Sequence, residues 1–321
     1  MDYIRKISLN EINNTLSKEV ALILFASFEN RCITLAREID IDTIKKTYVF
    51  RNVDKPMNTY NAGNLKTIQE RITGASIVEV SLSNPVLVAD ALFSIIIEIR
   101  DANIKNIVID ISTFTHETLL MLLKSLYVNR LFFDTISLVY NGASRYSDWL
   151  SKGCKDIRNV VGYPGFFNPS YKDHMIILTG FEKERATQLV ELFEPDILSI
   201  GNGCDPTSAD HQTMMEEMKE KFEEWSENLG SILSTPFDFS CSDISATMEK
   251  IEEIISRNSK ENYILVPLNT KLSTVSAALI ALKIPNIQVI YPVPETYNIS
   301  YSVPSDSFTV IDLKRIPGFN D

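Results

Sequence analysis

The sequence lacks the motifs that mark the commonest cofactor and catalytic sites. Its four cysteines, Cys32, Cys154, Cys204 and Cys241, are scattered and form no C-x-x-C pair, so we expect no structural zinc site. No G-x-G-x-x-G, G-x-x-x-x-G-K-[ST], G-x-S-x-G or H-E-x-x-H motif occurs. We therefore predict no dinucleotide cofactor, no P-loop nucleotide hydrolysis, no α/β-hydrolase chemistry and no other cofactor.

Long hydrophobic runs are also missing. No apolar stretch approaches the roughly 20 residues that cross a bilayer, and the run around Leu92–Ile97 ends at Glu98. The first residues, MDYIRKISLNEINN, have no apolar core of a signal peptide. We therefore expect a cytoplasmic protein that makes no membrane contact.

The charge of the chain is unevenly distributed. The 321 residues carry 31 Lys+Arg and 42 Asp+Glu, a net charge of −11. Residues 1–165 hold 19 basic and 18 acidic side chains, whereas residues 166–321 hold 12 and 24. The acidic C-terminal half argues against nucleic acid as the main partner. The near-neutral N-terminal half leaves room for a local anion site.

Apolar strand-like and helical segments alternate along the chain, which predicts an α/β fold with parallel sheets and helices on both faces. Val20–Ala26 (VALILFA) is typical of a strand that is buried on both faces. The stretch GYPGFFNPSY is rich in turn residues and suggests a domain junction. We predict two tandem Rossmann-like units, with a partly helical lead-in at 1–18, a first unit at 19–160, a junction at 161–173 and a second unit at 174–321.

Three segments recur in the same order in the two halves, which predicts an internal duplication. Each match combines a hydrophobic strand with similar residues in the loop that follows it. The matched pairs are 24–31 with 177–185, 107–115 with 264–272, and 136–147 with 287–298. Loops at the ends of parallel strands are the usual place for ligands, so we expect one cleft lined by both copies.

The first recurring motif supplies six candidate ligand contacts. In each copy a Glu and an Arg follow the strand, and they could hold a ribose hydroxyl and a phosphate respectively. The alternative is an ion pair that fastens the first helix to the loop. The candidates are Ser27, Glu29 and Arg31 with Thr179, Glu182 and Arg185.

The second motif is a hydroxyl-rich loop before a helix. Such loops suit phosphate or base recognition, and helix capping is the alternative. The candidates are Ser112, Thr113 and Thr115 with Asn269, Thr270 and Lys271. Asp110 ends an apolar strand, so we expect a hydrogen-bond donor beside it.

The third motif adds Asn141, Arg145 and Tyr146. A Tyr and an Arg together could stack on a base and contact a phosphate. Packing of the tyrosines at the interface between the two lobes is the alternative.

The run from Asp110 to Glu117 (DISTFTHE) resembles the loop after strand four of CARF domains, which are Rossmann-like sensors of cyclic oligonucleotides in prokaryotic defence. The tandem arrangement resembles the SAVED proteins. This resemblance implies that a nucleotide second messenger binds in a cleft between the two halves. It also implies a partner protein or a homo-oligomer, because such sensors act through an effector.

Three functions follow from these features. The leading hypothesis is a nucleotide-binding or nucleotide-sensing module, with antiphage defence as its expected setting. The first alternative is a hydrolase or nuclease at the same cleft, with Asp110, His116 and Glu29 as catalytic candidates and a divalent metal only in that case. The second alternative is a non-catalytic subunit of a larger complex.

Overall fold

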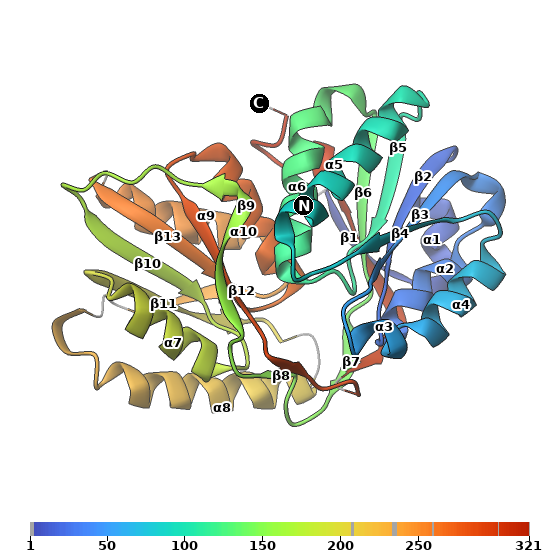
Figure 1. Ribbon diagram of the computed structural model, residues 1–321. Helices are drawn as coiled ribbons and strands as arrows, with labels where there is room; N and C mark the ends of the chain where they lie inside the picture. Colours follow the sequence, from blue (N-terminus) through green and yellow to red (C-terminus); the bar gives the residue numbers. More distant parts are fainter. Residues whose placement is uncertain (1–2, 207–208, 233–235, 259, 301, 321) are drawn as a thin grey trace. The chain divides into compact units, whose positions relative to one another are not determined.

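The computed structural model describes residues 3–206, 209–232, 236–258, 260–300 and 302–320. The chain divides into two compact units. Unit 1 comprises Met1–Arg145 and Ser302–Asp321, and unit 2 comprises Tyr146–Tyr301. Each unit has a mainly parallel sheet with helices packed on it, so the predicted α/β class is confirmed (Figure 1). None of the described helices is both long and apolar enough to span a membrane.

Unit 1 contains a seven-stranded sheet in the order β1-β17-β6-β5-β2-β3-β4. The five strands from β6 to β4 are parallel, and β17 lies antiparallel to both β6 and β1. The strands are β1 (Ile4–Ser8), β2 (Val20–Ala26), β3 (Ile44–Asn52), β4 (Ser76–Val80), β5 (Asn106–Asp110), β6 (Thr135–Tyr140) and β17 (Ser307–Asp312).

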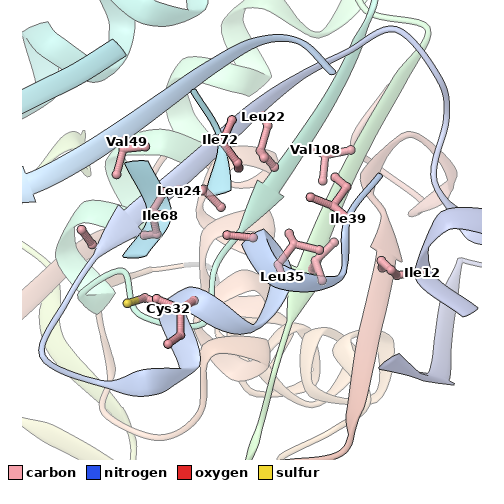
Figure 2. Packing of buried hydrophobic residues seen from close by; sticks show 14 of the residues in the cluster. Ile12, Leu22, Leu24, Cys32, Leu35, Ile39, Val49, Ile68, Ile72 and Val108 are labelled. Atoms are coloured by element: carbon pink, nitrogen blue, oxygen red, sulfur yellow. The ribbon is translucent and has the colours of Figure 1, made fainter. Parts of the chain in front are cut away.

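The helices of unit 1 begin at capping residues and pack on the sheet through apolar faces. Asn84 caps α5 by accepting from the N–H of Leu87, and Pro85 occupies the first helical position. Leu22 and Leu24 of β2 pack in one buried cluster with residues of α2 and α4 (Figure 2). The helices are α1 (Ile12–Thr15), α2 (Thr34–Glu38) after the 3₁₀ turn η2 (Asn30–Ile33), α3 (Met57–Tyr60), α4 (Ala62–Arg71), α5 (Pro85–Asp101) and α6 (His116–Asn129).

Unit 2 contains a six-stranded sheet in the order β12-β11-β10-β13-β14-β9, in which only β9 is antiparallel. The strands are β9 (Asp156–Pro164), β10 (Lys172–Leu178), β11 (Ile197–Cys204), β12 (Phe237–Ser240), β13 (Glu261–Pro267) and β14 (Gln288–Val293). The helices are α7 (Lys183–Phe193), α8 (Ala209–Ser226), α9 (Ile244–Ser256) and α10 (Lys271–Lys283).

The two sheets share one strand order. The series β4-β3-β2-β5-β6-β17 in unit 1 matches β12-β11-β10-β13-β14-β9 in unit 2, including the antiparallel last strand. Many doubly wound proteins use a related order, so the duplication itself stays a prediction.

The long strands that follow β6 and β14 in the sequence each pair with the other unit's sheet, so that β9 pairs with β14 and β17 pairs with β6. After β7 (Ala143–Tyr146) the chain forms β8 (Ser151–Lys152) and β9, which belong to unit 2. After β15 (Thr296–Tyr297) it forms β16 (Ser302–Pro304) and β17, which belong to unit 1. The short strands pair as β7 with β16 and β8 with β15. We call residues 151–164 and 302–312 the exchanged arms.

This exchange moves the domain boundaries away from those expected. The lead-in 1–18 includes β1, which joins the sheet of unit 1, and residues 302–320 return to that unit rather than ending unit 2. The expected junction at 161–173 lies inside unit 2, where it ends β9 and begins β10. Within this segment, Gly165 lets the backbone pass close to β14. It has φ +63°, and a Cβ there would lie 2.6 Å from the backbone N of Gln288.

Candidate functional site

The sequence motifs lie at the carboxyl ends of the central strands. In unit 1, Ser27 follows β2 and Ile111 follows β5; in unit 2, Thr179 follows β10 and Leu268 follows β13. These strand pairs are the points at which the strand order reverses. Ligands of open α/β sheets bind outside the carboxyl ends of strands at such points.

Glu29 and Arg31 form a buried ion pair in unit 1. The guanidinium Nε of Arg31 donates to Oε2 of Glu29 at 2.8 Å, and Nη1 donates to the carbonyl of Asn141 at 3.3 Å. The two residues are only 7% and 4% exposed. Because both groups are enclosed and oriented, the pair ties the loop after β2 to the end of β6.

Glu182 and Arg185 repeat this arrangement in unit 2. The two side chains form an ion pair, and Nη1 of Arg185 donates to the carbonyl of Pro292 at 3.0 Å. Pro292 follows Tyr291 in β14, just as Asn141 follows Tyr140 in β6. The ion-pair interpretation of the first motif therefore describes both copies.

A serine of each exchanged arm completes these pairs. Oγ of Ser302 donates to Oε2 of Glu29 at 2.8 Å. In unit 2, both Oγ and the backbone N–H of Ser151 donate to Oε1 of Glu182 at 2.8 Å. We call each Glu–Arg–Ser set a clasp, because it fastens an exchanged arm to the strand-end loop.

Asp110 is buried at the end of β5. Its Oδ1 accepts from the backbone N–H of Ser112 at 2.9 Å, so the expected donor is present, while Oδ2 has no hydrogen-bond partner among the described residues. Burial raises the pKa of Asp110 to about 7, although hydrogen bonds from Ser112 and the charge of Arg31 oppose the shift.

The hydroxyl groups of the loop after β5 bond within the protein. Oγ1 of Thr113 donates to the carbonyl of Phe25 at 2.7 Å, and Oγ of Ser112 accepts from the N–H of Asn141 at 2.8 Å. Thr115 caps α6 by accepting from the N–H of Thr118. The capping alternative therefore describes Thr115. His116 begins α6 and is half-buried.

The corresponding crevice of unit 2 is closed by the chain itself. Nδ2 of Asn269 donates to the carbonyl of Thr179 at 2.6 Å, and a Cβ on Gly180 would lie 1.9 Å from the carbonyl oxygen of Leu268. The cavity that remains there measures about 10 Å³, room for at most one water molecule, and Met215 of α8 helps to line it. Thr270 caps α10 and Lys271 is its first residue.

The third motif divides between the two units. Nδ2 of Asn141 donates to the carbonyls of Ser305 and Ser307 at 3.0 and 2.9 Å, which anchors the turn between β16 and β17. Arg145 is exposed in β7. The ring of Tyr146 packs edge-on against Phe181 and His211 of unit 2, each with centroids 5.8 Å apart.

A larger hollow lies beside the clasp of unit 1. None of the three recurring motifs predicts it. It measures about 600 Å³ and lies between η2, α2, α4 and the turn between β16 and β17. Its polar lining includes Asn30, Thr34, Arg37, Asn64 and Ser305. The spacing of 30, 34 and 37 places three of these on one helical face, which is the only sequence signal for the hollow.

Two contacts connect this hollow to the carboxyl edge of the sheet. Nδ2 of Asn64 donates to the carbonyl of Ser27 at 2.9 Å, and Ser305 accepts from Asn141. Arg37 is exposed, and within the described part of the chain no carboxylate forms an ion pair with it. The hollow thus presents the guanidinium of Arg37 and the carboxylate of Glu38 together with amide and hydroxyl groups.

No group of three His, Cys, Asp or Glu side chains that could hold a metal ion occurs among the residues that the structure describes. Glu29 and Asp110 lie near each other in unit 1, but the ion pair with Arg31 already occupies Glu29. A metal-dependent site would therefore need ligands beyond this pair.

The chain matches no protein-family model and no curated protein sequence. Two solved structures show distant similarity. AtPrR2 in its apo form is 12% identical over 74% of this chain and 86% of its own, with a TM-score of 0.24. The leucoanthocyanidin reductase of Vitis vinifera in its binary complex with NADPH is 14% identical over 83% and 87%, with a TM-score of 0.25. The α/β assignment therefore rests on the strand order and directions of the two sheets.

Proposed function

We propose that this chain is a nucleotide-binding module whose ligand occupies the hollow of unit 1. The single observation that carries the proposal is an open polar hollow of about 600 Å³ at the carboxyl edge of a doubly wound sheet. Its volume lies within the range of roughly 300–1,000 Å³ that small-molecule sites occupy.

The side chains of the hollow suit the parts of a nucleotide. Arg37 offers a planar cation to a phosphate. Asn30 and Asn64 offer amide donors and acceptors to a base or a ribose, and Ile33 offers an apolar surface. An anionic ligand also fits the charge of unit 1, which carries 18 basic and 19 acidic residues, better than that of unit 2, which carries 13 and 23.

The proposed site lies beside the strand-end crevice rather than in it. In both units, loop side chains bridge the ends of the central strands: Thr113 donates to the carbonyl of Phe25 in unit 1, and Asn269 donates to the carbonyl of Thr179 in unit 2. The hollow between η2, α2 and α4 is therefore the open position that the proposal assigns to the ligand in unit 1.

A sensing role follows from the position of the hollow. Asn30 lies between the clasp residues Glu29 and Arg31, and Ser305 lies three residues after Ser302. A ligand that contacts both segments would tighten the clasp on the exchanged arm, at the place where the chain returns from unit 2. In this proposal the ligand is a nucleotide second messenger, as the resemblance to CARF and SAVED proteins implies, and the setting is antiphage defence.

An enzymatic function is the second candidate, and Asp110 is the observation that favours it. A buried carboxyl group with a pKa of about 7 is suited to proton transfer near neutral pH. If the protein turns over a nucleotide, and Asp110→Asn abolishes this turnover but not binding, the function is catalysis rather than sensing.

Thermal shifts against linear and cyclic nucleotides test the proposal. A ligand at 100 times its dissociation constant stabilises the folded state by about 2.7 kcal/mol, which such a scan detects. We expect Arg37→Ala to weaken binding by roughly 10- to 100-fold, because a charged hydrogen bond is lost. Lys66→Ala, on α4 but outside the lining, is the control. An absence of shifts across the panel, or equal binding by Arg37→Ala, would overturn the proposal.

A further inference from the structure

The outer face of α5 carries an unusual stripe of exposed residues. Val86 is 57% exposed and Phe93 is 42% exposed, Ile97 is half-buried, and Asp90 and Arg100 are exposed. At 100° per residue these five positions fall within about 40° of one line along the helix. We call them the α5 stripe.

The opposite face of α5 already supplies what the fold of unit 1 needs. Val88, Leu92, Ile95 and Ile99 are buried there. The α5 stripe therefore adds exposed apolar surface on the side of the helix away from these buried residues.

The corresponding helix of unit 2 has no such stripe. The helix α5 connects the edge strand β4 to β5, and α9 likewise connects the edge strand β12 to β13. The exposed residues of α9 include Glu249, Glu253 and Arg257, and Nη2 of Arg257 donates to Glu253 at 2.8 Å. One helix of the pair thus presents charges to solvent, as a surface helix normally does, whereas the other presents Val86 and Phe93.

The order of residues along the α5 stripe is complementary to itself. The stripe positions 86, 90, 93, 97 and 100 follow the alternating spacing of four and three residues that is typical of helices that pack side by side. Asp90 and Arg100 flank the apolar pair of Phe93 and Ile97. In an antiparallel pair of α5 helices centred on residue 95, each Asp90 faces an Arg100 and each Phe93 faces an Ile97.

We propose that the α5 stripe is the interface of a homodimer with a two-fold axis near Ile95. A parallel pairing would place Asp90 against Asp90 and Arg100 against Arg100, which like-charge repulsion disfavours. Within the described residues Asp90 has no ion pair, and Arg100 has only its neighbour Asp101, at 3.3 Å and with 42% and 65% of the two side chains exposed. Both charges are therefore available to a second copy. A single helix pair buries little area, so the dimer is weak and depends on concentration.

Sedimentation equilibrium of the full chain at micromolar concentrations, with charge-swap variants, tests this interface. We expect a reversible dimer for the wild type. Asp90→Arg and Arg100→Asp should each weaken dimerisation by about tenfold or more, because each places like charges together. The double variant Asp90→Arg/Arg100→Asp restores the opposite pairing and should regain most of the affinity.

Two further variants keep the test independent of folding. Phe93→Glu should abolish the dimer while the far-UV circular dichroism spectrum is kept, because the side chain is exposed. Phe166→Glu changes a phenylalanine that is 71% exposed in unit 2 and should leave dimerisation unchanged. A monomer at all concentrations, or a double variant no better than the single ones, would overturn the proposal.

Discussion

Ser302 donates a hydrogen bond of 2.8 Å to the carboxylate of Glu29, although the two residues are 273 positions apart in the sequence. Ser151 makes the same contact with Glu182 in unit 2. In both units the carboxylate also holds an arginine that reaches the end of a central strand. The clasps thus connect three separate segments at the carboxyl edge of the sheet.

Ser302→Ala should lower the free energy of unfolding by about 1–3 kcal/mol, because a hydrogen bond to a buried carboxylate is lost. Urea denaturation followed by circular dichroism measures this change. Ser300→Ala is the control, because Ser300 is exposed and uses its backbone carbonyl to accept from Ser147. Equal stability of the two variants would show that the clasp does not hold the arm.

Arg31→Ala should be more severe, with a loss of roughly 3–5 kcal/mol, because Glu29 is left as a buried charge without its cation. The double variant Glu29→Gln/Arg31→Met removes both charges and should recover a large part of that loss. Chemical denaturation of the single and double variants gives the coupling. Additive losses would contradict a buried pair. The exposed Arg37→Ala should cost less than about 0.5 kcal/mol.

Asp110 should make the protein less stable as the pH rises from about 4 to 7. Burial raises the pKa of the folded-state carboxyl from its ordinary value of 3.8 to about 7, so the folded state binds an extra proton in this window. The penalty reaches at most about 4 kcal/mol above pH 7. Asp110→Asn should flatten this dependence and stabilise the protein at pH 8. Asp134→Asn, on an exposed loop, should leave the profile unchanged.

His174 should act in the opposite direction. Its ring nitrogens form hydrogen bonds with Glu261 at 2.7 Å and with Ser199 at 2.8 Å. Burial lowers its pKa below the ordinary value of 6.5, although the hydrogen bond with Glu261 opposes this shift. Stability is therefore fully present above pH 6.5 and falls as the pH drops below it. His174→Gln should remove part of this acid sensitivity in a pH series of thermal melts, and an unchanged slope would contradict it. His211, whose pKa burial lowers to about 4, accounts for a further part.

Local patterns allowed the regular elements to be predicted. The apolar run of β2, the Asn84–Pro85 start of α5 and the caps Thr115 and Thr270 all depend on neighbouring residues. The sequence does not predict α4. Only Leu65 and Ile68 are buried in this polar segment with a glycine, so the spacing of its apolar residues is a weak sign of a helix.

The clasps and the hollow depend on contacts that the sequence does not order. The repeat paired Glu29 with Glu182 and Arg31 with Arg185, but the partners Ser302 and Ser151 enter only because the arms are exchanged. The repeat also matched Thr113 with Thr270, whereas the caps show that Thr115 is the structural counterpart of Thr270. The loop after β5 is thus two residues longer than its counterpart, a difference that only the positions of the helices reveal.

Hydrogen exchange with and without a nucleotide that stabilises the protein tests the central claim most directly. A ligand in the hollow of unit 1 should slow exchange in residues 30–38, 62–68 and 302–306, because binding closes local opening of these segments. Residues 179–182 and 202–204 of unit 2 should be unaffected, since that position is closed. Protection confined to unit 2, or no local protection in spite of a thermal shift, would contradict a ligand site in unit 1.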